Sequence, residues 1–576
     1  MENKLKVKIL ESIKNKFQIE LNDLKLTNPP KKELWDIAFN CWILARDLKK
    51  NPSLIAEDLK EELLKIEEID KVDIEQGFIN LFISKNIYND LFQKILSTSF
   101  EKREKTKNIV IDYIWANVWK PLHIGHMCTP NQWQVLVNVY RRLWYNVVAD
   151  SHIWDWGIIF WKLILAFKKW WDEEKLEKDA INHLLELYIK ITEEAEKEDN
   201  IEEEIREEFK KLSEGNSESV ELWKKFTSFS ISSMQTQLDR LNVKPNYNIW
   251  ESFYEWLGLP KLEDYPDLKD DMHSIVNELI EKWIATKNED SSVWVNFDDE
   301  LKISSCILQK RDWTHGYLAS DLAAIKYRVQ NWNPEKIVYF VDSRQQLHLK
   351  QAFTIAKLAW WIKETELFHA ANWFISLKDW AMSTRKWRII KLDKLLDEAE
   401  DRAKKIILEK RDDIGWEELD KLSKIIGIWA IKYWYLKKNR ETDVIFDWDE
   451  FMTFEWNSWP YIQYAYVRAL RILENFKWDL NIKNPTFEKT EEIELIKILS
   501  KYNDILEEVV KWNQPHILAK YSYDLTKVFN SFYNNIHILN EESNEKKISR
   551  LKLVELFSKV LKESFNLLGI DMPEKM

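Results

Sequence analysis

The sequence predicts an α/β protein in which a parallel-sheet domain lies between an N-terminal α/β module and a largely helical C-terminal domain. Between residues 106 and 395, four apolar runs typical of buried strands lie at 109–113, 146–150, 336–342 and 373–377, with helical patterns between them. Strands that alternate with helices favour a doubly wound parallel sheet. From about residue 395 onward the helical period dominates. The length of 576 residues suits several domains of about 100–200 residues each.

The N-terminal module, residues 1–105, mixes both kinds of pattern. Helical runs cover residues 4–17, 34–50 and 54–66, and residues 72–83 alternate between apolar and polar as a strand does. The charged string 101–107 is expected to link this module to the sheet domain.

The central domain, residues 106–395, contains an acidic helical insertion at about 173–290, which is most strongly helical over 173–229. A helical connecting region at 396–450 leads into the C-terminal helical domain at 451–576. Helices are predicted over residues 392–409, 416–438, 461–476, 491–510, 515–533 and 544–568.

Charge and cysteine content exclude several classes of protein. Cys41, Cys128 and Cys306 are far apart, which excludes a disulfide scaffold and a cysteine-based zinc site and suits a reducing cytoplasm. The sequence has no signal peptide and no 18-residue apolar run, so we expect no membrane contact. A net charge of −12 argues against a histone-like protein whose whole surface is basic, although local basic patches can still hold RNA. We expect a cytoplasmic monomer without a DNA partner.

Tryptophan and glycine are present in anomalous numbers. The chain has 31 Trp and 9 Gly, whereas average usage of about 7% would give about 40 Gly, the total of the two. Several Trp stand at positions typical of glycine in turns, such as Trp313 after Asp312 and Trp332 after Asn331. One interpretation is an unusually Trp-rich protein. The other is that a codon written as Trp here specifies Gly in the source organism, as UGA does in some bacterial lineages.

The first motif that carries chemistry is His123-Ile124-Gly125-His126, preceded by Lys120 and Pro121. It follows the strand run at 109–113 and opens a predicted helix. A helix N-terminus offers free N–H groups, Gly125 lets a phosphate approach the backbone, and the two imidazoles can donate to developing negative charge. A pair of structural histidines is the alternative interpretation.

The second motif is Met382-Ser383-Thr384-Arg385-Lys386, in a loop between the strand run at 373–377 and the helix predicted from residue 392. Hydroxyl, guanidinium and ammonium groups on one loop can clamp a polyphosphate during adenylyl transfer. A solvated charged loop is the alternative interpretation. The order of the two motifs and the distance between them favour a shared nucleotide site instead.

Together these motifs resemble a class I aminoacyl-tRNA synthetase, and specifically an arginyl-tRNA synthetase. The resemblance covers nearly the whole chain, and it implies a Rossmann-like catalytic domain with an N-terminal added domain and a C-terminal all-α anticodon-binding bundle. Trp154 and Trp387 stand where the family has Gly, whereas Trp156, Trp223 and Trp448 stand where it has Trp. The segments that carry the resemblance are 111–113, 117–126, 152–157, 345–348, 382–386, 446–449, 461–468 and 567–570.

The resemblance implies a pocket for L-arginine. Carboxylates suit a guanidinium, which presents its N–H donors in one plane. The positions that match the family's arginine-binding residues are Asp112, Asn117, Tyr317, Asp321 and Gln345. Tyr317 and Asp321 are four residues apart and would share one helical face. Taken alone, Asp321 is equally well explained as a helix cap.

The implied reaction joins arginine to ATP with release of pyrophosphate and then transfers arginine to tRNA(Arg). His123 and His126 would stabilise the phosphate transition state, and Mg²⁺ would accompany ATP without a metal site made of protein ligands alone. The family loop can carry a second lysine where this chain has Thr384, and we expect Lys120 to replace it as a catalytic cation. The remaining ATP-binding positions are Gly125, His348, Met382, Ser383, Arg385 and Lys386.

Contacts with tRNA are expected from both ends of the chain. The N-terminal module resembles the added domain that touches the tRNA corner. Tyr461, Tyr464 and Arg468 could hold unpaired bases, and Lys437 and Lys438 could meet phosphates. The alternative for the tyrosines is a buried aromatic stripe, and the alternative for the two lysines is a solvated helix end.

Three other functions stay open from the residues alone. Small nucleotidyltransferases share His-x-Gly-His but lack a large helical C-terminal domain. A synthetase of another specificity is disfavoured for apolar substrates by Asp112 and Asp321. A non-catalytic RNA-binding paralogue gains weight if Trp154 and Trp387 are genuine, because they would crowd loops that need backbone freedom. The resemblance further implies that tRNA is needed for the first step.

Overall fold

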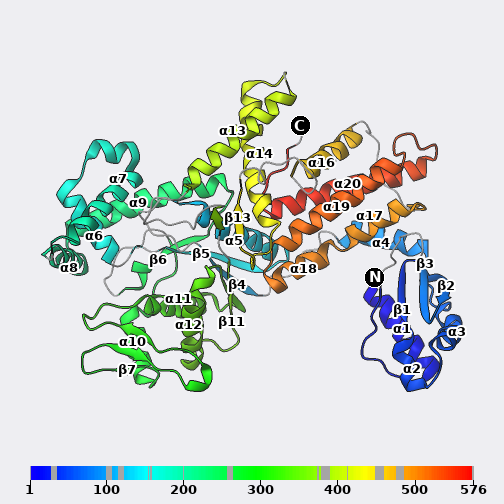
Figure 1. Ribbon diagram of the computed structural model, residues 1–576, viewed down its shortest axis with the longest axis horizontal. Coiled ribbons are helices and arrows are strands. Elements are labelled where there is room, and N and C mark those ends of the chain that lie inside the picture. The colour runs from blue at the N-terminus through cyan, green and yellow to red at the C-terminus, as the bar shows by residue number, and fades with distance from the viewer. Residues whose placement is uncertain are drawn as a thin grey trace.

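A computed structural model shows an elongated molecule with a parallel sheet in its central domain (Figure 1). The sheet has five strands in the order β11-β10-β4-β5-β6, and each neighbouring pair is parallel. These strands are β4 (Asn108–Tyr113), β5 (Asn146–Ile153), β6 (Tyr247–Trp250), β10 (Lys336–Tyr339) and β11 (Glu366–His369). The structure describes residues 2–27, 35–98, 107–113, 122–153, 155, 158–198, 200–255, 264–372, 375–377, 390–411, 413–447, 459–474 and 485–573.

The order of the strands fixes where a ligand can bind. From β4 the chain passes through helix α5 (Ile124–Arg142) to β5 on one side of β4, whereas β10 pairs on the other side. Connections that leave neighbouring strands in opposite directions open a crevice at the carboxyl ends of those strands. The ends of β4 and β10 therefore define the site, and the predicted doubly wound sheet is confirmed.

Two predictions for the central domain were wrong in detail. The segment Tyr247–Trp250 lies inside the predicted helical insertion but forms β6, because its backbone pairs with the end of β5. Strand β12 (Ile375–Leu377) pairs with β13 (Val444–Phe446) instead of joining the five-stranded sheet. The helical part of the insertion consists of α7 (Glu173–Ala195), α8 (Asn200–Ser213) and α9 (Ser217–Arg240), preceded by α6 (Ile158–Trp170).

The second half of the central domain supports the crevice from the β10 side. Its helix α11 (Tyr317–Trp332) runs back from a three-stranded antiparallel sheet to β10, and α12 (Gln346–Leu358) leaves the end of β10. The other elements are η1 (Glu251–Tyr254), α10 (Met272–Glu281), β7 (Thr286–Lys287), β8 (Val293–Val295), η2 (Asp299–Leu301), β9 (Cys306–Gln309) and η3 (Ser343–Gln345).

The N-terminal module is built on a three-stranded antiparallel sheet in the order β1-β3-β2. Two sequence predictions are corrected here. Residues 34–50 are not one helix, because Ile37–Asn40 pairs with β3 as an edge strand. Residues 72–83 form two strands separated by a turn at Gly77, whose φ of +83° suits glycine. The elements are α1 (Glu2–Phe17), β1 (Ile37–Asn40), α2 (Trp42–Leu48), α3 (Pro52–Leu63), β2 (Ile69–Glu75), β3 (Phe78–Ile83) and α4 (Lys85–Thr98).

The C-terminal half is helical, as predicted. The predicted helix over 491–510 is in fact two helices that meet at Lys501, where the Ser500 hydroxyl donates to the Lys497 carbonyl and competes with the helical backbone. The helices are α13 (Leu392–Lys410), α14 (Trp416–Leu436), α16 (Trp459–Glu474), α17 (Thr490–Ser500), α18 (Tyr502–Trp512), α19 (His516–Asn535) and α20 (Asn544–Leu567).

The N-terminal module lies beneath this bundle, next to α17 (Figure 1). Lys497 of α17 donates to Asp36, just before β1, at 2.8 Å. The predicted division of the chain at residues 105, 395 and 450 stays a prediction.

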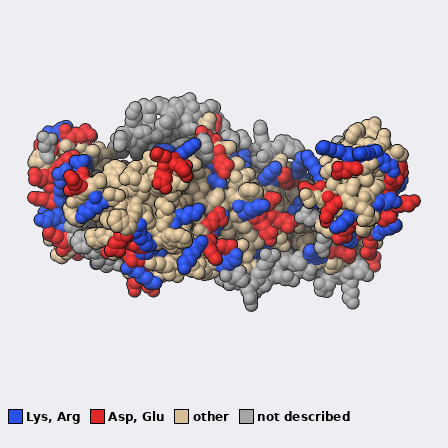
Figure 2. Space-filling model, turned by 90° about the horizontal axis from the view of Figure 1, so that it is seen from below, with Lys and Arg blue, Asp and Glu red and all other residues tan. Residues whose placement is uncertain are grey.

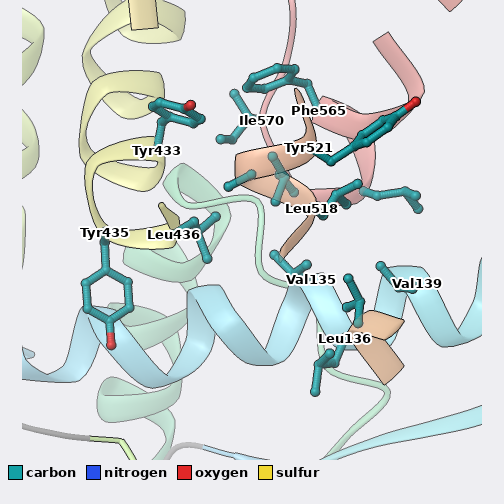
Figure 3. Packing of buried hydrophobic residues seen from close by; sticks show 14 of the residues in the cluster. Val135, Leu136, Val139, Tyr433, Tyr435, Leu436, Leu518, Tyr521, Phe565 and Ile570 are labelled. Atoms are coloured by element: carbon teal, nitrogen blue, oxygen red, sulfur yellow. The ribbon is translucent and has the colours of Figure 1, made fainter. Parts of the chain in front are cut away.

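Helix α5 joins the five-stranded sheet to the C-terminal bundle. Its apolar side chains Val135, Leu136 and Val139 pack in one cluster with side chains of α14, α19 and α20 (Figure 3). Polar contacts reinforce this packing. The Asn138 amide donates to the Leu567 carbonyl at 3.0 Å, and Arg142 forms an ion pair with Glu563. The first turn of α5, which carries the histidine motif, is thereby linked to the far end of the chain.

A buried lysine adds a second link between these parts. The Lys432 ammonium donates to the carbonyls of Leu241, at the end of α9, and Gly569, just after α20, the latter at 2.7 Å. Burial lowers the pKa of Lys432 to about 7. Both acceptors lie at helix C-termini, where a cation is favoured.

Charged side chains are interspersed on the surface. Figure 2 shows basic and acidic groups mixed across the described part of the face seen from below, as a net charge of −12 would suggest. Among the described residues, no helix has both the length and the apolar character that crossing a bilayer requires.

The backbone separates the tryptophans into two kinds. Trp144, Trp283, Trp313 and Trp360 have φ between +58° and +67°, which is the left-handed region that favours glycine. Trp283 and Trp360 are also 94% and 81% exposed. By contrast, Trp223 is buried, and its indole N–H donates to Asp155 at 3.1 Å.

We expect Trp283→Gly and Trp360→Gly each to raise the free energy of unfolding by about 1 kcal/mol, because glycine removes the cost of a left-handed backbone. Urea denaturation measures the change. The control is Trp223→Gly, which should lower the free energy of unfolding by roughly 3–5 kcal/mol because it leaves a cavity at a buried site. A loss of stability in both exposed variants would contradict the expectation.

Candidate active site

The histidine motif forms the first turn of α5 in the crevice. His123 is the N-cap, and its Nδ1 accepts from the Gly125 N–H at 3.1 Å. His126 Nδ1 accepts from the His123 N–H at 3.2 Å, and the two ring centroids lie 3.9 Å apart. Because Nδ1 is an acceptor in both rings, each neutral imidazole carries its proton on Nε2 and can donate from there. The motif thus combines a helix N-terminus with two imidazole donors.

The chain that follows the second motif returns beside the first. His123 and Lys391 form an antiparallel bridge, in which the Ile124 N–H donates to Ile390 at 3.0 Å and the Leu392 N–H donates to Leu122 at 2.9 Å. This contact anchors the end of the loop next to the histidines. Met382, Ser383, Arg385 and Lys386 themselves lie outside the described residues, as do Asn117 and Lys120.

Asp321 and His348 meet on the β10 side of the crevice. Asp321 is buried on α11 and bonds to Nε2 of His348, in the first turn of α12. Burial lowers the pKa of His348, but the hydrogen bond and charge of Asp321 outweigh it, so the pKa is raised overall. Tyr317, one turn before Asp321, is 55% exposed, and Gln345 lies at the start of α12. Four predicted residues therefore gather on two adjoining helices.

Asp112 lies at the end of β4 and is 1% exposed. Its Oδ2 accepts from Arg328 Nη1 at 2.8 Å, and Arg328 also bonds to Asp150 of β5. Sequence reasoning anticipated the buried carboxylate but did not anticipate its cationic partner.

Glu251, in η1, is a further carboxyl group that the sequence reasoning missed. It is 4% exposed, and its Oε1 accepts from the Ser320 hydroxyl at 2.9 Å. Among the described residues, Oε2 has no hydrogen-bond partner. Burial raises the pKa of Glu251 well above its ordinary value, with a further contribution from the nearby carboxyl groups. An acid that directly follows a buried strand was the signal that could have revealed it.

Acidic groups dominate this part of the interior. Asp155 accepts from the Ser252 N–H at 2.9 Å, and burial raises its pKa to about 6. Glu255 contacts His315 Nδ1 at 3.2 Å. Six buried carboxyl groups form an acidic cluster, and they belong to Asp112, Asp150, Asp155, Glu251, Glu255 and Asp321. Among the described residues, one guanidinium, that of Arg328, and three imidazoles, those of His152, His315 and His348, lie beside these carboxyl groups.

Comparison with known proteins agrees with this geometry. Residues 86–448 match the family model described as the catalytic domain of class I (R) tRNA synthetases. Residues 3–83 match the arginyl-tRNA synthetase N-terminal domain, and residues 462–576 match the DALR anticodon-binding domain. The chain belongs to the arginyl-tRNA synthetase family.

Relatives of this synthetase cover its whole length. It is 36% identical over 576 residues to the arginine–tRNA ligase of Clostridium botulinum strain 657, with 99% of each chain covered. It is 35% identical over 577 residues to that of Clostridium kluyveri, covering 98% of this chain and 99% of the relative.

Solved structures of the family share its fold. The Plasmodium falciparum arginyl-tRNA synthetase superposes with a TM-score of 0.78 at 24% identity, covering 100% of this chain and 99% of that one. The Thermus thermophilus arginyl-tRNA synthetase gives 0.77 at 20% identity and covers all of both chains. The predicted class I fold is confirmed.

The candidate tRNA contacts of the synthetase lie on α16 and at the end of α14. On α16, Tyr464 is 46% exposed, whereas Tyr461 is half-buried. The Arg468 guanidinium lies 4.5 Å from the ring centre of Tyr533. Lys437 and Lys438 are partly exposed at the end of α14, where the Lys438 ammonium lies 4.1 Å from the Trp434 ring.

Nearby Arg440 points inward. Its guanidinium is buried and donates to the Asn513 carbonyl at 3.1 Å and the Ala371 carbonyl at 2.9 Å. Arg440 is therefore a structural residue.

A cavity of about 960 Å³ lies elsewhere, between the N-terminal module and the C-terminal helices α17 to α20. Acidic and basic groups line it together, such as Lys94, Glu494, Lys520 and Asp524. It lacks the histidine motif and the acidic cluster. The crevice at the sheet is the better candidate for the chemistry, because the motif residues converge there.

The buried His152 of β5 should make stability depend on pH. Burial lowers its pKa to about 4, whereas an unfolded histidine titrates near pH 6.5. The unfolded chain thus takes up a proton between pH 6.5 and 4 that the folded chain does not. The contribution of His152 is complete above pH 6.5 and is lost as the pH falls toward 4.

Urea denaturation of the wild type and His152→Gln tests this. The difference in unfolding free energy between them should shrink by roughly 3 kcal/mol from pH 7 to pH 4. His537→Gln, at an exposed histidine, is the control. A difference for His152→Gln that does not change with pH would contradict the expectation.

Proposed function

We propose that this synthetase ligates L-arginine to tRNA(Arg) in two ATP-dependent steps. The arginine carboxylate attacks the α-phosphate of ATP, which gives arginyl-adenylate and releases pyrophosphate. A hydroxyl of the terminal tRNA ribose then attacks the activated carbonyl, which gives arginyl-tRNA and releases AMP. The observation that carries the proposal is the excess of buried carboxyl groups beside the histidine motif.

The acidic cluster suits a substrate with two positive charges. Free arginine carries a guanidinium and an α-ammonium against one carboxylate, and buried carboxyl groups without a full set of cations lower their energy by taking up such a ligand. Asp321, Tyr317 and Gln345 would contact arginine on the α11–α12 side, and Asp112 and Asn117 on the β4 side. Glu251, with one buried oxygen lacking a described partner, would join them.

The reacting phosphates would lie at the first turn of α5. His123 and His126 would donate from Nε2 to charge that develops on the α-phosphate, and Gly125 would leave room for close approach to the helix N-terminus. His348 would border the nucleotide. Lys120 would stabilise the departing pyrophosphate, with Met382, Ser383, Arg385 and Lys386 in the closing loop.

Mg²⁺ is part of the proposal as the companion of ATP. Among the described residues, no group of three or more His, Cys, Asp or Glu is placed to hold a metal ion, so its ligands would come mainly from phosphates and water. We further propose that the enzyme acts as a monomer and binds tRNA through the N-terminal module, through Tyr461, Tyr464 and Arg468, and through Lys437 and Lys438.

We also propose that most tryptophans stand for glycines of the native chain. Four have a left-handed backbone, and Trp35 and Trp144 bury indole N–H groups that have no hydrogen-bond partner among the described residues. Genuine buried tryptophans usually satisfy this group, as Trp223 does.

Peptide mass spectrometry of the protein isolated from its source should find Gly at Trp144, Trp313 and Trp360 and Trp at Trp223. The measurement is direct, because the two residues differ by about 129 Da. Tryptophan at all four positions would refute the recoding proposal and leave the ligase proposal intact.

Asp321→Asn should raise the KM for arginine at least about tenfold and leave the KM for ATP nearly unchanged, because it removes a charge-assisted contact with the substrate. The assay is pyrophosphate exchange with each amino acid in turn, in the presence of tRNA. Asp420→Asn, which removes an exposed ion pair with Lys424 on α14, is the control. Exchange that depends on another amino acid would count against the proposed specificity.

A further inference from the structure

The ion pair of Arg328 with two carboxylates is the most deeply buried charged contact in the described catalytic domain. The guanidinium is 0% exposed, and its carboxylate partners Asp112 and Asp150 are 1% and 0% exposed. Nη1 donates to Asp112 Oδ2 at 2.8 Å, and Nε and Nη2 donate to Asp150 Oδ2 at 2.8 and 2.7 Å. One side chain of α11 thus contacts the end of β4 and the middle of β5.

The two carboxylates need this cation. Asp112 and Asp150 face each other across the β4–β5 pair, where like charges repel. The planar guanidinium bonds to both at once, which a single ammonium cannot do with the same geometry. Arg328 thereby fixes the direction in which the Asp112 carboxylate points.

The same residue sets the position of α11. Asp321 and Arg328 are seven residues apart, which is close to two helical turns, so both lie on the face of α11 that meets the sheet. At one end of this face Asp321 bonds to His348, and two turns later Arg328 bonds to the strands. The distance between the α11 side and the β4 side of the arginine pocket therefore depends on Arg328.

We propose that Arg328 is a positioning residue for arginine binding, which holds Asp112 in register with Tyr317 and Asp321. It does not itself touch the substrate. The inference rests on the proposed roles of these residues in the arginine pocket.

The primary test is Arg328→Lys in the full-length protein, which keeps the charge and loses the double contact. Pyrophosphate exchange should show a KM for arginine raised about tenfold or more and a KM for ATP within about twofold of the wild type. The matched control is Lys326→Met on the same helix, which removes ion pairs with Glu278 and Asp270 outside the pocket. It should leave both KM values unchanged.

A double-mutant cycle identifies Asp112 as the group through which Arg328 acts. Once Asp112→Asn has removed the carboxylate, Arg328→Lys should raise the KM for arginine much less than it does in the wild type. Equal effects in both backgrounds would overturn the inference. So would an Arg328→Lys protein with a lowered Tm and an unchanged KM for arginine, because that result describes a purely structural residue.

If Arg328→Lys does not fold, Asp150→Asn provides the test, because it weakens only one of the two contacts. It should raise the KM for arginine about threefold with the KM for ATP unchanged, and no change would overturn the inference. A wild-type enzyme that shows no arginine-dependent exchange would instead refute the proposed function, and this inference with it.

Discussion

The position of the two motif histidines depends on helix α5. Its first turn is closed by hydrogen bonds in which His123 and His126 accept backbone N–H groups, and its remaining length packs against the C-terminal helices. A helix is stiff over this length, and a packed interior transmits strain. The position of the two motif imidazoles is therefore coupled to that of the C-terminal bundle through α5. Lys432 adds a second link between these parts, because it bonds to the carbonyls at the ends of α9 and α20.

The chemistry of the crevice rests on contrasting charge environments. At the start of α5, the positive end of the helix and the Nε2 donors of the two motif histidines favour a polyphosphate. In the acidic cluster, buried carboxyl groups favour a cation, and burial holds the pKa of Glu251 and Asp155 above their ordinary values. A substrate that carries a guanidinium at one end and a carboxylate at the other can satisfy the acidic cluster while presenting its nucleophile to the phosphate. The arrangement orients both reactants, which is the main contribution expected in adenylyl transfer.

Local patterns in the sequence predicted the regular elements well and the pairing of strands less well. The long helices of the C-terminal half and the strand before His123 follow from periodicity, which is a local property. The strand at Tyr247–Trp250 did not, because four residues after a long helical insertion carry little signal, and their state is set by pairing with β5 some hundred residues earlier. The site shows the same division. Asp112, Asp321 and His348 were identified from motif context, whereas Arg328 and the pairing of Asp321 with His348 became evident only when the fold brought these residues together.

The pairing of β4 with β10 has a consequence for how the chain is made. These strands are neighbours in the sheet, but more than two hundred residues separate them in the sequence, so the crevice cannot form before β10 has been synthesised. The N-terminal module can close its own small sheet well before that point. Long-range pairing of this kind is slow and leaves apolar surface exposed until it is complete. A nascent chain would thus carry an unfinished parallel sheet until β10 emerges, with β4, β5 and β6 waiting for the strand that completes the crevice.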